Sequence, residues 1–189
     1  MGLPVSVLAR GVGADSPATD RVVRLLFAEL REVDATFSPY RPDSFVSRVA
    51  RGDLLLRECA DKVRDVAVRC ERARNWTGGL FDATRPDGTW DPSGLVKGWA
   101  VERAARHLAG QRAVADTVDW CVNAGGDVMV LAPSGRYFVV GIADPRDPLA
   151  VAATISRGGG AVATTCTATR APTSTTRARL LPSSRAGWR

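Results

Sequence analysis

The sequence lacks several features that would assign it to a common class of protein. No apolar run approaches the roughly 20 residues that a membrane-spanning helix requires, so we expect no membrane segment in this chain. No Gly-Lys-Ser/Thr follows a glycine-rich stretch, which excludes a P-loop. The only histidine, His107, lies beside two arginines on an expected helix, and it is better interpreted as solvated than as catalytic.

The beginning of the sequence has no basic segment followed by an apolar one. A secretory signal requires both. We therefore expect a cytoplasmic location for the chain as given. The alternative is an exported or lipid-anchored protein, if the true start lies upstream and encodes a signal peptide.

The four cysteines form no pattern of a disulfide framework or of a metal site. No two of them are spaced as Cys-x-x-Cys, and none has a histidine at metal-ligand spacing. Such thiols usually behave as small apolar side chains. We expect reduced core or surface thiols at Cys59, Cys70, Cys121 and Cys166.

The net charge of +6 is unevenly distributed along the sequence. Residues 171–189 contain four arginines and no acid, which leaves +2 for residues 1–170. A nucleic-acid-binding protein usually concentrates its positive charge on the folded domain. Because the body of this chain is nearly balanced, we expect no nucleic-acid partner.

Helical periodicity marks the first half of the chain, and strand-type runs mark the second half. We expect helices at residues 20–37, 61–74 and 95–108, with Asp20 capping the first helix. The first helix has an apolar stripe formed by Val22, Leu26, Leu30, Val33 and Phe37. Strands are expected at residues 4–10, 118–122, 127–131, 136–141, 151–155 and 161–164. Helices early and strands late favour one α+β domain with mostly antiparallel pairing.

The most informative stretch is DPSGLVKGWA at residues 91–100. A tight Asp-Pro-Ser-Gly turn runs there into the start of a helix. Such a turn presents backbone N–H groups, a carboxylate and one cation at a single place. This combination suits a phosphate ester with a bound metal ion.

Each residue near this stretch also has a plainer interpretation. Asp82 and Asp91 could be turn caps, because aspartate bonds its own backbone in turns. Tyr40 could be a loop aromatic between prolines, and Lys97 a solvated helix lysine. The NAGGD segment at residues 123–127 could be a simple hairpin turn.

Three motifs in register resemble the ApbE family of flavin transferases (FAD:protein FMN transferases). They are FDAT at residues 81–84, DPSGLVKG at residues 91–98 and NAGGD at residues 123–127. Weaker matches include Met1-Gly2 at the start and FSPYRPDS at residues 37–44. The resemblance covers residues 1–170 and implies a single ApbE-like domain, with helices packed on mostly antiparallel strands, that is incomplete at the C-terminus.

The resemblance also implies a reaction. It is the magnesium-dependent transfer of FMN from FAD to a threonine of a target flavoprotein, with release of AMP. The alternative is a catalytically inactive, truncated flavin-binding protein. By motif match, the FAD site would be lined by Met1, Tyr40, Leu80, Phe81, Asp82, Asp91 and Lys97. The backbone carbonyl of Gly94 would bind Mg²⁺, and the catalytic residues stay unknown.

Residues 171–189 depart from the family pattern. Members continue with a His-x-x-Asp-Pro motif, whereas this segment is rich in Arg, Ser, Thr and Pro without periodicity. Such a composition is typical of a disordered tail. Skipping the first two bases of one allowed coding of residues 171–179 restores Ala-His-Ile-Tyr-Asp-Pro-Arg-Thr. We therefore expect a tail that is out of frame, and reading the gene across the Arg170 codon tests this.

Overall fold

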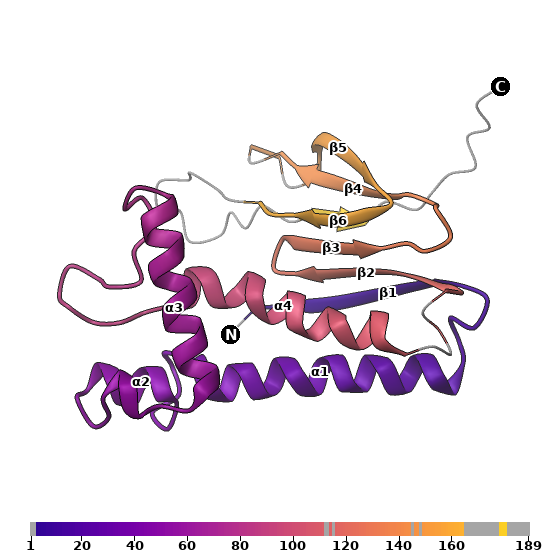
Figure 1. Cartoon of the computed structure of the whole chain (residues 1–189). Helices are drawn as coiled ribbons and strands as arrows, with labels where there is room; N and C mark the ends of the chain where they lie inside the picture. The colour runs from indigo at the N-terminus through magenta and orange to yellow at the C-terminus, as the bar shows by residue number, and fades with distance from the viewer. Residues whose placement is uncertain are drawn as a thin grey trace. The chain divides into compact units, whose positions relative to one another are not determined.

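The computed structural model describes residues 3–111, 114, 116–144, 146–147 and 149–164, and the backbone of residues 178–180. It divides into two compact units. The helical unit is Leu25–Ala104, and the sheet unit is Gly2–Arg24 with Ala105–Arg189. Figure 1 labels the elements of both units.

The helical unit contains helices that the sequence only partly predicted. The helices are α1 (Pro17–Phe37), α2 (Phe45–Ala50), the short 3-10 helix η1 (Leu56–Glu58), α3 (Asp61–Trp76) and α4 (Ser93–Gly110). Helices α1 and α4 each run through both units. The expected apolar stripe of α1 is buried at every position: Val22, Leu26, Leu30, Val33 and Phe37. The periodicity therefore identified the buried face of the helix.

The start of α1 differs from the prediction. The helix begins at Pro17 rather than at Asp20, and Asp20 lies in its first turn. Ser16 takes the capping role, because its hydroxyl accepts a hydrogen bond from the Thr19 N–H at 3.3 Å. Proline favours the first turn of a helix, where its missing N–H costs nothing.

Two aromatic rings and one ion pair join α1 to α4 within the helical unit. The rings of Phe37 and Trp99 meet edge to face with centroids 5.5 Å apart. Arg103 lies over the Trp99 ring at 5.0 Å and bonds Glu29 at 2.7 Å. These contacts hold the first part of α4, where the candidate site begins.

The sheet unit consists of antiparallel strands in two sheets. Its strands are β1 (Val5–Gly11), β2 (Val118–Ala124), β3 (Asp127–Leu131), β4 (Phe138–Ala143), β5 (Val151–Arg157), β6 (Gly159–Val162) and β7 (Ala178–Leu180). The first sheet has the order β1-β2-β3-β6, and Figure 1 shows these four strands side by side. The second sheet has the order β5-β4-β7. The predicted α+β class with antiparallel pairing is confirmed.

Strand β7 lies within the segment that the composition suggested was a disordered tail. Its backbone pairs with β4, from Val140↔Leu180 to Ile142↔Ala178. The composition of this segment had indicated no strand. Residues 165–177 and 181–189 lie outside the described residues.

The NAGGD segment forms a two-residue hairpin turn between β2 and β3. Ala124 pairs with Asp127, and both intervening glycines have positive φ, 56° at Gly125 and 99° at Gly126. Two positive φ values in succession are characteristic of the hairpin turn that matches the twist of its strands. The Gly126 N–H donates to Asn123 Oδ1 at 3.0 Å. The local structure of residues 123–127 is therefore the simple hairpin turn that was one of the two interpretations of this motif.

The described cysteines are buried and free, as the spacing suggested. Burial raises the pKa of the Cys70 thiol to about 11 and that of Cys121 to about 12. Burial likewise raises the pKa of Cys59. A thiol with a raised pKa is a poor nucleophile near neutral pH, so these three residues act as small apolar side chains. Cys166 lies outside the described residues.

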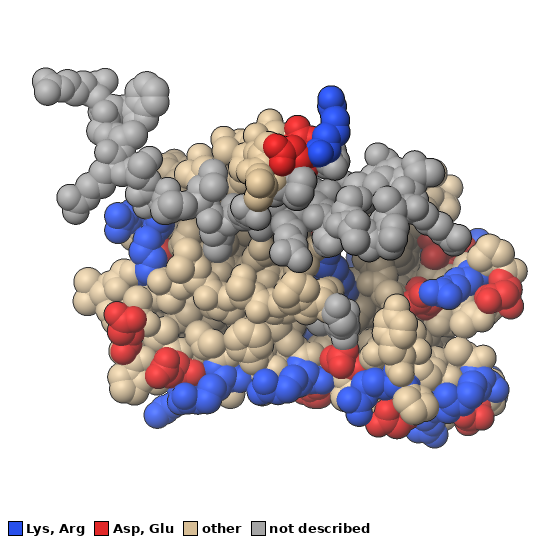
Figure 2. Space-filling model, turned by 180° about the vertical axis from the view of Figure 1, so that it is seen from behind, with Lys and Arg blue, Asp and Glu red and all other residues tan. Residues whose placement is uncertain are grey.

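Charged side chains of opposite sign are interleaved on the surface. Figure 2 shows Lys and Arg alternating with Asp and Glu along the lower edge of the view. The exposed ion pairs of the chain include Arg69–Asp65 at 2.9 Å and Arg41–Asp43 at 3.1 Å. Within the described ranges, no helix is both long and apolar enough to cross a membrane.

Candidate functional site

The segment that follows α3 is folded back on the end of that helix. The Thr77 hydroxyl donates to the Ala73 carbonyl at 2.8 Å and accepts from the Phe81 N–H at 3.0 Å. Gly78 and Gly79 lie between them with φ of 61° and 86°, values that other residues rarely adopt. Phe81 is thereby held close to the last turn of α3.

Residues 83–91 form a closed loop that resembles a small hairpin. Thr84 and Trp90 make an isolated antiparallel bridge, and the Asp91 N–H donates to the Ala83 carbonyl at 2.7 Å. A tight turn at Gly88, with φ of 82°, reverses the chain. Because the two ends of the loop are bonded, Asp82 and Asp91 are brought to the same end of it.

Asp82 is held by an arginine of the preceding helix. Its Oδ2 lies 2.9 Å from Arg74 Nε, and its Oδ1 accepts from the Thr84 N–H at 2.7 Å. Its side chain is 35 % exposed, so one edge of the carboxylate stays open to solvent. Asp82 is therefore both a turn cap, as the plainer interpretation predicted, and one end of an ion pair.

Asp91 organises the start of α4. Its Oδ1 accepts hydrogen bonds from the Ser93 N–H at 3.0 Å and from the Ser93 hydroxyl, and its Oδ2 pairs with Arg85. Burial raises the pKa of the Asp91 carboxyl, but the hydrogen bonds from Ser93 and Arg85 outweigh burial and hold the pKa below its ordinary value. Asp91 is thus an anion at neutral pH.

The first turn of α4 brings two predicted residues together. A Cβ placed on Gly94 would lie 3.2 Å from Cε2 of Phe81, so the aromatic ring covers the position that glycine leaves open. Lys97 follows one turn later and is half-buried. The helix N-terminus carries a partial positive charge, to which Arg85 and Lys97 add their own.

Tyr40 and Leu80 are the most solvent-exposed of the predicted residues. Their side chains are 86 % and 94 % exposed, which is unusual for large apolar groups. Leu80 directly precedes Phe81, and Tyr40 follows Pro39. Both side chains therefore offer exposed apolar surface close to the candidate site. Met1 lies outside the described residues, so the structure does not place it.

A cavity of about 180 Å³ lies between the Tyr40 segment and the 83–91 loop. Pro39 and Ser47 line it from one side, and Arg85, Trp90 and Asp91 from the other. Pockets for drug-sized molecules usually measure about 300–1,000 Å³, so this cavity would hold part of a ligand rather than all of it.

Sequence reasoning missed the two arginines of this site. Arg74 and Arg85 pair with Asp82 and Asp91, and neither belongs to a motif that marked the region. The position of Arg85 between Asp82 and Asp91 in the sequence could have indicated that it pairs with one of these carboxylates. Trp90, beside Asp91, was also overlooked.

The described residues do not make up a magnesium site by themselves. They include no group of three His, Cys, Asp or Glu side chains able to hold a metal ion. Both nearby carboxylates, Asp82 and Asp91, are paired with arginine. Mg²⁺ requires near-octahedral oxygen coordination, and the Gly94 carbonyl is a single donor.

The ApbE family model matches residues 83–178, just over half of the chain. No curated protein matches the chain in a sequence comparison. Solved structures with a similar fold include three ApbE proteins. An ApbE protein of Thermotoga maritima is 18% identical with a TM-score of 0.68, over 85% of this chain and 66% of that one.

The other two structures are flavin transferases by name. Flavin transferase ApbE of Vibrio cholerae is 19% identical with a TM-score of 0.55, over 76% of this chain and 65% of that one. The apo flavinyl transferase ApbE of Pseudomonas stutzeri is 18% identical with a TM-score of 0.57, over 82% and 65%. At these identities the likeness shows a shared fold. The chain spans just under two thirds of each of the three structures.

Proposed function

Because the chain belongs to the ApbE family, we propose that it binds FAD and transfers FMN to a threonine of a target flavoprotein, with release of AMP. The observation that carries this proposal is the closed 83–91 loop beside the start of α4. It holds Asp91 and its partner Arg85 at the N-terminus of α4, and Asp82, which pairs with Arg74, directly precedes it in the chain. A dinucleotide presents both kinds of complementary group, anionic phosphates and hydroxyl or N–H donors.

The cations of the site suit the phosphates of FAD. The guanidinium groups of Arg74 and Arg85 are about half exposed, so each could exchange its carboxylate for a phosphate oxygen. The positive end of α4 lies next to Asp91 and would favour the same anion. Lys97, one turn into α4, would add a further positive charge.

The carboxylates suit the remaining polar groups of FAD. Asp91 is held as an anion and can only accept hydrogen bonds, so it would bind a ribose hydroxyl or a ring N–H. Asp82 has an exposed edge available for the same purpose. The apolar faces of Tyr40, Leu80 and Phe81 would cover the rings.

The reaction that we propose depends on magnesium. When bound, Mg²⁺ would supply positive charge that stabilises the pyrophosphate as AMP leaves. The Gly94 carbonyl would be one of its oxygen ligands. The role of this chain that the geometry supports is to bind and orient the flavin nucleotide.

The proposal is tested with the full chain, FAD, Mg²⁺ and a target flavoprotein. Quenching of flavin fluorescence measures binding, and the mass of the target measures FMN transfer. We expect Asp91→Ala to weaken FAD binding about tenfold, because hydrogen bonds to a charged group contribute about 1.5–3 kcal/mol. Asp53→Ala is the control, since it also removes the acidic partner of an arginine, Arg51, but at a position outside the proposed site.

The outcomes separate the candidate functions. An FMN adduct on the target threonine supports the transferase. FAD binding without any adduct supports the alternative, a flavin-binding protein without catalysis. Failure to bind FAD, or equal binding by Asp91→Ala and Asp53→Ala, would contradict the site as described.

A further inference from the structure

The sheet unit contains a second cavity, which the proposed flavin site does not use. It begins at a row of register partners across three strands. Trp120 of β2 pairs with Leu131 of β3, and Leu131 pairs with Gly159 of β6. Register partners point to the same face of a sheet, so this row presents a large ring, a leucine and then no side chain.

Gly159 leaves the end of this row open. A Cβ built at Gly159 would meet no atom within 4 Å, and its φ lies outside the region that favours glycine. The backbone there could accept a side chain without strain. The missing side chain therefore creates a hollow.

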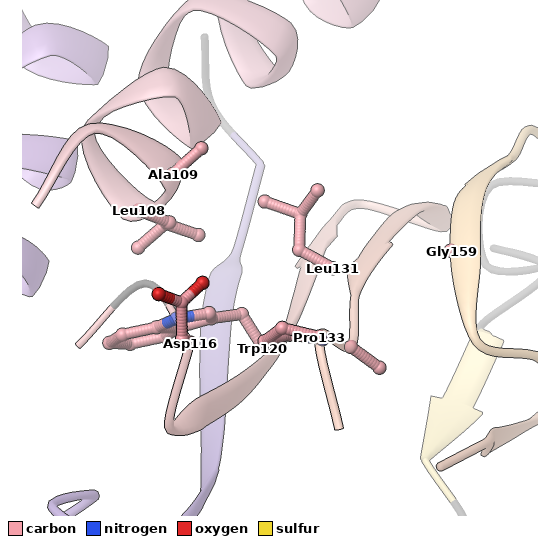
Figure 3. A pocket seen from close by; sticks show the side chains of 8 residues that line it. Leu108, Ala109, Asp116, Trp120, Leu131, Pro133 and Gly159 are labelled. Atoms are coloured by element: carbon pink, nitrogen blue, oxygen red, sulfur yellow. The ribbon is translucent and has the colours of Figure 1, made fainter. Parts of the chain in front are cut away.

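The hollow is part of a cavity of about 370 Å³. Its walls are mainly apolar, with Leu108, Leu131 and Pro133 among them, and Asp116 contributes a carboxylate. Figure 3 shows Leu108 and Leu131 on one side of the Trp120 ring and Pro133 beside it. A cavity of this size with few polar groups is typical of a small-molecule site.

One wall residue of the cavity, Trp120, carries a hydrogen-bond donor that has no partner within the described part of the chain. Trp120 is 2% exposed, and among the described residues its indole Nε1–H has no hydrogen-bond partner. Buried polar groups are almost always satisfied, because leaving one unpaired costs stability. The indole N–H can only donate, so whatever satisfies it must offer an acceptor.

We propose that this cavity, the Trp120 pocket, binds a small, mainly apolar molecule whose carbonyl or ether oxygen accepts the indole N–H. The exposed Asp116 carboxylate would favour a ligand that also carries an ammonium group. The proposal does not depend on FAD binding, since every residue of the pocket belongs to the sheet unit.

Two simpler partners could satisfy the same donor. Asp116 lines the cavity and is drawn over the ring nitrogen in Figure 3, so its carboxylate could turn to accept the N–H. A trapped water could do so as well. In both cases, added ligands should leave the indole N–H resonance of Trp120 unchanged.

A matched set of probes separates these cases. Acetophenone carries the acceptor, isopropenylbenzene has the same shape without it, and 4-(aminomethyl)acetophenone adds an ammonium group. The readout is the indole N–H resonance of Trp120 in ¹H–¹⁵N spectra of the full chain, assigned by its absence in Trp120→Phe. We expect acetophenone to shift this resonance and to bind at least about threefold more tightly than isopropenylbenzene, as one net hydrogen bond allows.

Variants test each wall of the pocket. Trp120→Phe keeps an aromatic ring and removes the donor, so it should abolish the preference for acetophenone, whereas Trp76→Phe, at an exposed indole, should leave it unchanged. Gly159→Leu should fill the hollow and weaken both neutral probes. Asp116→Asn should remove the advantage of the ammonium probe.

Three results would overturn the proposal. One is that no probe shifts the Trp120 resonance at millimolar concentration, which indicates a bound water only. Another is that the resonance follows the titration of a carboxylate and this dependence disappears in Asp116→Asn, which makes Asp116 the partner. The third is that Trp120→Phe, shown to be folded by its thermal unfolding, retains the preference for acetophenone.

Discussion

Each unit of the chain holds a carboxylate bonded to one serine and one arginine, but the partners lie at very different distances along the sequence. In the helical unit, the partners of Asp91 are two and six positions away. In the sheet unit, the partners of Asp119 are 15 and 109 positions away. The same set of groups thus shapes a local turn in one unit and joins distant segments in the other.

Asp119 cross-links the sheet unit from within. Arg10 of β1 lies 3.1 Å from its Oδ2, and Ser134 donates from both its N–H and its hydroxyl, at 3.1 Å and 2.7 Å. The Asp119 side chain is 2% exposed, and Arg10 also covers the Phe138 ring at 4.1 Å. No ligand could reach this carboxylate without breaking the sheet.

The surroundings of Asp91 are more open than those of Asp119. Its side chain is 13% exposed, its partner Arg85 is 58% exposed, and a cavity lies beside both. Its contacts order a loop rather than the fold, so one of them could be exchanged for a ligand. The difference shows that burial and sequence separation, rather than residue type, distinguish a structural carboxylate from an available one.

The largest expected effect is on stability. Asp119→Ala should lower the free energy of unfolding by about 3 kcal/mol, since it leaves a largely buried arginine without its partner. Asp91→Ala should cost about 1 kcal/mol, the usual cost of a lost helix cap with an exposed ion pair. Urea unfolding of both variants measures the comparison. Equal losses would mean that Asp91 is as structural as Asp119.

The stability that Asp119 contributes to the sheet unit should depend on pH. Burial raises the pKa of Asp119, but the hydrogen bonds from Ser134 and Arg10 prevail and keep it below its ordinary value of 3.8. A carboxylate whose pKa is lowered by folding stabilises the protein above its unfolded pKa, and this stability is lost as the pH falls through the folded pKa. Stability should therefore decline below about pH 4.

Asp119→Asn tests this assignment, because an amide cannot titrate. Its unfolding free energy, measured by urea titration from pH 6 to pH 2, should fall less steeply than that of the wild type. Asp91→Asn should flatten the curve less, because Asp91 and its partners are more exposed. A curve of wild-type steepness in Asp119→Asn would place the acid sensitivity elsewhere.

The smallest expected effect concerns two glycines of α4. Gly94→Ala would place a Cβ 3.2 Å from the Phe81 ring, whereas Gly98→Ala, one turn later, would meet no atom within 4 Å. Gly98→Ala should stabilise the chain by up to about 1 kcal/mol through helix propensity alone. Gly94→Ala should gain less and should weaken FAD binding about threefold because the ring must move. Thermal unfolding would measure the stability of the two variants, and flavin fluorescence would measure their FAD binding. Equal stability and equal FAD binding of the two variants would contradict the placement of Phe81 in the site.

Much of the fold was accessible from the sequence because it follows from local periodicity. The apolar stripe of α1 and the strand at residues 127–131 were predicted at the right positions. The short elements α2 and η1 were missed, since six and three residues carry too little periodicity to be recognised. The start of α1 was misplaced because Ser16 and Pro17 together made a stronger helix start than Asp20.

The candidate site was accessible only in part. The motifs marked Asp82, Asp91 and Gly94, and whether these bind flavin and metal stays a prediction. The partners of the carboxylates, Arg74 and Arg85, were not predicted, because pairing depends on how the loop closes and not on the spacing of residues.

The sequence by itself determined which face of α1 is buried, where most of the strands lie, and where the two glycines of residues 123–127 turn the chain. These features depend on interactions between near neighbours, which the order of residues specifies directly. Only the tertiary structure decided that Asp119 is a buried cross-link, that Asp91 lines a cavity, and that the Trp120 donor has no partner among the described residues. Those properties arise when segments up to 109 positions apart meet, and the sequence does not record which groups then remain without a partner.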